Sequence, residues 1–120
     1  MSSEISPKIQ NQLSQLQQTQ QQAQMLVGQK SQIELSLRDV DRALEAVEVT
    51  TDDVVLYQTV GNILIKSNKN ETIESLKKKE ESLDLRLKTF TRQEERIQKR
   101  FTEQQERLKE ALDTAGITAQ

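Results

Sequence analysis

The spacing of apolar residues divides the chain into two long helical arms and a short central segment. From Pro7 to Glu48, apolar residues recur mostly at steps of three and four, which places them on one face of an α-helix. Ser6 before Pro7 is a typical helix start, because serine caps free N–H groups and proline fits the first helical position. Gln20 and Lys30 fill two gaps in the series, and the two steps of three after Gln20 predict a local overwinding of the coil. The apolar positions are Ile9, Leu13, Leu16, Ala23, Leu26, Ile33, Leu37, Val40, Leu44 and Val47.

The second arm carries a more regular repeat. Steps of three and four alternate without a break for about six heptads, which is typical of a coiled coil. Asn68 and Glu71 have the spacing of a capping box, and Gly116 follows the last periodic residue, where helices commonly end. The repeat positions are Ile73, Leu76, Glu80, Leu83, Leu87, Phe90, Glu94, Ile97, Phe101, Gln104, Leu108, Ala111 and Ala115.

The central segment predicts a β-hairpin. Two stretches rich in β-branched side chains, Val54–Tyr57 and Ile63–Ile65, flank Gly61-Asn62, which suits a two-residue turn. This turn lies near the midpoint of the chain, so two arms of nearly equal length, each roughly 65 Å long, fold back on each other. The predicted fold is mainly α, an antiparallel two-helix coiled coil with a short central hairpin. Residues 1–120 form one domain, with helices over 6–48 and 71–115 and a hairpin linker over 50–70.

The hairpin is apolar on both faces, although a lone hairpin is marginally stable and its strand edges are unpaired. Either it covers the end of its own coil, or it pairs with hairpins of other subunits in a shared sheet or barrel. The second interpretation is favoured, because the apolar surface exceeds what a two-stranded ribbon buries. The predicted assembly residues are Val54, Leu56, Tyr57, Val60, Gly61, Ile63, Leu64 and Ile65.

The two chain ends carry a second candidate surface. The glutamine-rich stretch from Gln10 to Gln24 is either low-complexity disorder or a frayed, adaptable helix end. Apolar residues near both ends either close the coil or, where the helices fray, form a binding surface for other proteins. The predicted binding residues are Ile5, Ile9, Leu13, Leu16, Phe101, Leu108, Leu112 and Ile117.

Composition favours a binding protein over an enzyme. Hydrophobic residues make up 33% and aromatic residues 2% of the 120 residues, which is too little for a thick globular core. Without histidine or cysteine, we expect no catalytic residues, no metal site and no cofactor. A net charge of −2 favours no nucleic-acid partner, and no apolar run is long enough for a membrane span. The lack of a signal-peptide pattern and of disulfides fits the cytoplasm.

Two segments carry a family resemblance. The stretch YQTVGNILIKS (Tyr57 to Ser67) between matched arms, with QEERIQKR (Gln93 to Arg100) in the second arm, resembles the beta subunit of archaeal prefoldin. The resemblance implies a hexamer of two alpha and four beta subunits whose hairpins join into β-barrels. It also implies a holdase that binds unfolded proteins at the coiled-coil tips and passes them to a group II chaperonin without ATP. The alternative is a structural coiled-coil adaptor that binds one specific partner.

Overall fold

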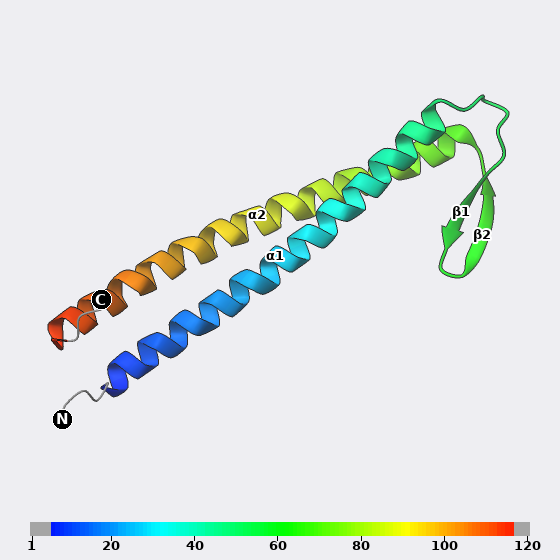
Figure 1. The fold of residues 1–120 in the computed structure, drawn as a ribbon. Coiled ribbons are helices and arrows are strands. Elements are labelled where there is room, and N and C mark those ends of the chain that lie inside the picture. The colour runs from blue at the N-terminus through cyan, green and yellow to red at the C-terminus, as the bar shows by residue number, and fades with distance from the viewer. Residues whose placement is uncertain (1–5, 117–120) are drawn as a thin grey trace. The chain divides into compact units, whose positions relative to one another are not determined.

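The computed structural model describes residues 6–116 and contains two long helices joined by a β-hairpin (Figure 1). Helix α1 spans Pro7–Glu48, and the Ser6 hydroxyl accepts a hydrogen bond from the Ile9 N–H at 3.2 Å, as its capping role requires. Helix α2 spans Lys69–Thr114. Asn68 Oδ1 accepts a hydrogen bond from the Glu71 N–H at 2.9 Å, so the predicted cap places the start of α2 at Lys69. The mainly helical fold predicted from the sequence is confirmed.

The hairpin consists of β1 (Leu56–Val60) and β2 (Ile63–Ser67), paired antiparallel with Val60 opposite Ile63 and Leu56 opposite Ser67. Gly61 has a φ of 61°, whereas Asn62 does not have a positive φ. This combination matches a type II′ turn, whose twist suits a two-residue hairpin and which favours glycine at its first central position.

The structure corrects the predicted start of the first strand. Val54 and Val55 lie in the loop before β1, because the Val54 N–H donates to the Thr51 carbonyl at 3.2 Å in a turn. The opposite strand also ends at Ser67, and Asn68 already caps α2. No partner strand therefore remains for residues before Leu56 in the described part of the chain.

The helices contribute to two compact units. The central unit holds residues 30–89, and the terminal unit holds residues up to 29 together with residues from 90 onward. In the central unit, the line of contact between α1 and α2, called the seam here, buries part of the predicted apolar positions, with α2 supplying Leu83. The buried α1 residues there are Ile33, Val40, Leu44 and Val47. The remaining predicted apolar positions are half-buried: Leu37, Ile73, Leu76 and Leu87.

In the terminal unit the seam differs from the prediction at one position. Thr19 is 3% exposed, while Gln20, which the sequence placed on the seam, is exposed. Through Leu16, Thr19, Ala23 and Leu26 the steps are three, four and three, so the repeat needs no overwinding. The Thr19 hydroxyl donates to the Gln15 carbonyl at 3.0 Å, which satisfies its polar group inside the helix and makes burial possible.

Candidate protein-binding surfaces

The first candidate surface is the hairpin, which exposes apolar side chains on both faces. Residues directly opposite in the register share a face, so Val60, Ile63 and Ile65 lie on one face. Tyr57 and Leu64 lie on the other face. All five are between 49% and 68% exposed, although these are residue types that folded chains usually bury. Leu56 is half-buried, and the loop residues Val54 and Val55 are half-buried and exposed respectively.

The edges of the hairpin add to this surface. The sheet has two strands, so each strand pairs on one side and presents its other backbone edge without a strand partner in the described residues. Such an edge is a template for adding strands from another chain. Exposed apolar faces together with free edges make the hairpin suitable for building a larger sheet with other chains.

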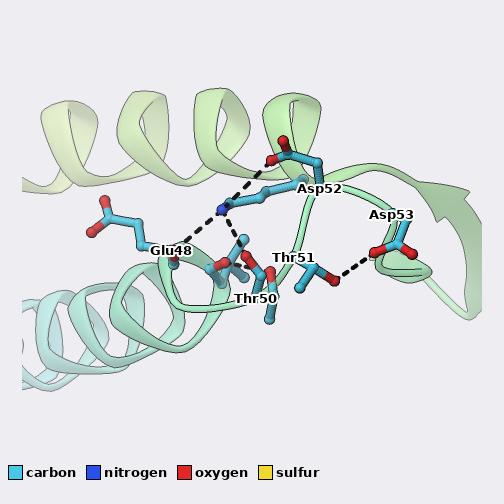
Figure 2. Close-up of polar contacts among 7 residues, drawn as sticks. Glu48, Thr50, Thr51, Asp52 and Asp53 are labelled. Carbon is cyan, nitrogen blue, oxygen red and sulfur yellow. Dashed lines mark hydrogen bonds and ion pairs between the residues drawn. The ribbon is translucent and has the colours of Figure 1, made fainter.

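A set of polar contacts connects the start of α2 to the end of α1 and to the loop before β1. The ammonium group of Lys69 donates to the carbonyl oxygens of Glu48 and Thr50 and lies near the Asp52 carboxylate, three residues that Figure 2 labels. The distances from Lys69 Nζ are 3.2 Å, 2.8 Å and 3.9 Å in that order. In the same loop, the hydrogen bond from the Thr51 hydroxyl lowers the pKa of the Asp53 carboxyl below its usual value. Sequence reasoning missed Lys69, because its partners lie 19 and 21 residues away.

The second candidate surface, at the ends of the helices, is mostly closed in the structure. Ile9 and Leu108 are buried at 4% and 9% exposure. The side chains of Leu13, Leu16, Phe101 and Leu112 are half-buried. Ile5 and Ile117, which the sequence also placed on this surface, lie outside the described residues. The apolar groups therefore line the seam of the terminal unit, and a partner reaches the buried ones only where the two helices separate.

This seam contains polar residues, of which only Gln104 was placed on the repeat from the sequence. The side-chain Oε1 atoms of Gln12 and Gln104 are buried and accept no hydrogen bond within the described part of the chain. Together with Thr19 they place polar side chains among the apolar residues of this seam. Buried acceptors without a donor cost free energy, so Gln12 and Gln104 weaken the closed seam. Gln104 is a repeat position of the second arm, and steps of seven back from Leu26 lead to Thr19 and Gln12.

Two shallow grooves border the terminal seam. One, of about 600 Å³, is lined largely by carbon atoms of α1 and α2, including Ala23, Leu26 and Ile97. The other, of about 540 Å³, lies beside Ile9 and Gln12 with Arg107 and Glu110 on its rim. Both grooves lie beside seam residues, Leu26 in the first and Ile9 in the second.

The central seam contains a pair of carboxyl groups. The pKa of Glu80 is raised above its usual value, and the main cause is the hydrogen bond between Glu80 and Asp41. Desolvation and the negative charges of Asp41 and Asp84 raise it further, and Lys77 lowers it. When Glu80 loses its proton, its carboxylate and that of Asp41 repel each other. This repulsion destabilises the contact between the helices at that point.

The chemistry of the described residues offers little for catalysis. They contain no group of three or more histidine, cysteine, aspartate or glutamate residues placed to hold a metal ion. None of the helices in residues 6–116 has the length and apolar character needed to cross a membrane.

Two long helices joined by one exposed apolar hairpin define a class of coiled-coil assembly subunits. The chain belongs to the prefoldin family, since a sequence profile described as prefoldin subunit matches residues 10–115. The prefoldin subunit beta of Methanococcoides burtonii is 54% identical over 97% of this chain and 99% of its own length. That of Methanothrix thermoacetophila is 50% identical over 93% of each chain. The crystal structure of the prefoldin beta subunit from Thermococcus strain KS-1 is similar, with a TM-score of 0.84 at 37% identity, covering 91% and 96% of the two chains.

These comparisons confirm the resemblance to prefoldin beta that the hairpin and arm segments indicated. Prefoldin subunits are chaperone subunits and not enzymes. The fold and family together therefore make this chain a chaperone subunit of the prefoldin type.

Proposed function

We propose that the chain is the beta-type subunit of a cytoplasmic, ATP-independent holdase. In this proposal, two alpha and four beta subunits assemble through their hairpins into a β-barrel platform. The ends of the coiled coils then hold unfolded proteins and deliver them to a group II chaperonin. The main support is the hairpin, whose five apolar residues remain about half or more exposed on both faces of an unpaired ribbon.

Client binding is proposed at the seam of the terminal unit. Its apolar residues are Ile9, Leu13, Leu16, Phe101, Leu108 and Leu112. Because Ile9 and Leu108 are buried, client binding requires the helices to separate locally. Gln12 and Gln104 lower the free energy of this opening, since their buried side-chain oxygens accept hydrogen bonds from water when the seam opens. A surface that opens and repacks suits clients without a fixed shape.

Charge substitution on the hairpin tests the assembly step. Ile63→Asp with Ile65→Asp places two carboxylates on a face that is apolar and, in the proposal, covered by other subunits. The double variant, co-expressed with an alpha-type partner, should keep helical arms by circular dichroism and lose the hexamer by native mass spectrometry. The matched control is Leu85→Asp, because Leu85 is a similarly exposed apolar residue on α2. A wild-type hexamer in the double variant contradicts assembly through the hairpin.

An adaptor is distinguished from a holdase by its choice of partners. A holdase suppresses the aggregation of several unrelated denatured proteins when the hexamer and the denatured protein are present in nearly equal amounts. An adaptor binds one partner and suppresses the aggregation of none of them. Light scattering during dilution of two unrelated denatured proteins therefore decides between the two functions.

A further inference from the structure

Lys69 occupies a position that its own helix disfavours. It is the first residue of α2, where the helix dipole is positive and a cation is unfavourable. Its side chain is nevertheless only 19% exposed and contacts the end of α1 (Figure 2). Helix α1 has no basic residue in its last turn, so the carbonyl of Glu48 lacks a local cation. Lys69 supplies that cation from across the sequence and also binds the Thr50 carbonyl in the loop leading to β1.

Ser67 makes a second connection, at the end of β2. Its hydroxyl accepts a hydrogen bond from Gln58 Nε2 of β1 at 3.0 Å. The same oxygen lies 3.1 Å from the Thr72 hydroxyl in the first turns of α2. Ser67 and Gln58 are half-buried, unlike most side chains of the hairpin. One serine therefore joins both strands to α2, while Lys69 joins α2 to the loop before β1.

Little apolar packing fixes the direction of the hairpin. Of its strand residues, only Leu56, Gln58 and Ser67 are half-buried, and the others are exposed. We infer that Lys69 and Ser67 are positioning residues that hold the hairpin at one angle to the helix ends, ready to pair with hairpins of other subunits. This inference rests on the proposed assembly through the hairpin.

These contacts affect assembly through the fraction of chains whose hairpin has the geometry that pairing needs. If the hairpin samples many angles, only a fraction of the chains has the geometry that sheet pairing needs at any time. The apparent affinity between subunits is then reduced by that fraction. A hydrogen bond from a charged donor is strong enough to shift such an equilibrium by about tenfold. Lys69→Met keeps the apolar stem and removes the ammonium group. It should weaken hexamer assembly about tenfold or more without changing helicity.

The test compares Lys69→Met with Lys79→Met, which removes an exposed ammonium from the same helix. Each chain is mixed with an alpha-type partner, and hexamer dissociation is followed by mass photometry across a dilution series. Lys69→Arg retains donors for the two carbonyls, so it should keep most of the assembly affinity that Lys69→Met loses. Ser67→Ala should also weaken assembly, and it provides a second variant if Lys69→Met folds poorly. Wild-type assembly in both Lys69→Met and Ser67→Ala overturns the inference.

A second readout measures the angle itself. The chain has no cysteine, so Glu45→Cys with Asn62→Cys allows spin labels only at the end of α1 and at the turn. In the unassembled chain, Lys69→Met should broaden the distribution of label distances relative to Lys79→Met. An unchanged narrow distribution overturns a positioning role even if assembly weakens. If Ile63→Asp with Ile65→Asp leaves the hexamer intact, the proposed assembly itself fails, and this result is distinct from either outcome for Lys69.

Discussion

Replacing Gln104 with leucine should strengthen the seam of the terminal unit. The Oε1 atom of Gln104 is buried and accepts no hydrogen bond among the described residues. A buried unsatisfied polar group costs about 1–3 kcal/mol, and leucine at this repeat position removes that cost while keeping a similar volume. The closed seam should therefore gain about 1–3 kcal/mol, so amide hydrogen exchange near position 104 should slow by roughly 5- to 150-fold.

The assay is hydrogen exchange with mass spectrometry on the assembled complex, read on peptides from residues 7–29 and 90–114. Peptides from residues 30–48 serve as an internal reference. Gln105→Leu is the matched control, because Gln105 is exposed one residue away and its replacement should leave exchange unchanged. Client capture should fall in Gln104→Leu, because a tighter seam opens less often. Unchanged or faster exchange in Gln104→Leu refutes the argument that the polar seam residues weaken the closed coil.

Three further predictions concern Gly28, Gly61 and Glu80. Gly28→Ala should raise the free energy of unfolding by about 1 kcal/mol in thermal melts, because an added Cβ meets nothing within 4 Å and alanine favours the helix. Gly61→Val should weaken hexamer assembly by native mass spectrometry, since a positive φ in this turn costs a residue with a side chain about 1–3 kcal/mol. Equal assembly losses in Gly28→Ala and Gly61→Val would contradict the turn assignment. The raised pKa of Glu80 means that the folded chain holds this proton more tightly, so stability falls as pH rises from 4.5 to the raised value. Glu80→Gln should therefore melt higher than the wild type at pH 7 and equally near pH 3.5, and equal melting at both values would contradict repulsion from Asp41.

The repeat pattern predicted the helices well because the apolar stripe and the helix period depend on local sequence. Ser6 and Asn68 cap their helices as expected, since a cap involves residues only three apart. Burial of Thr19 was not expected, because Gln20, four residues after Leu16, was assigned to the seam instead. The Gln15 carbonyl accepts a hydrogen bond from the Thr19 hydroxyl within the helix, which makes the burial possible. The extent of β1 was also wrong, because it depends on where the opposite strand ends.

At the candidate surfaces too, features that depend on nearby residues were predicted, and features that depend on residues distant in the sequence were not. Exposure of Ile63 and Tyr57 followed from the excess of apolar residues over what two strands bury. The contacts of Lys69 depend on the α1 end, the loop and the α2 start coming together, and no short-range pattern encodes them. Burial of Ile9 and Leu108 likewise depends on how closely the two helices pack.

Aggregation suppression by a truncated complex is the most direct test of the account. Removing residues 1–12 together with residues 112–120 deletes Ile9 and Leu112 of the proposed client surface and leaves the hairpin intact. The truncated chain, assembled with an alpha-type partner, should form the hexamer and lose the ability to keep unrelated denatured proteins from scattering light. Full suppression by that truncated hexamer would contradict client binding at the ends of the coiled coils.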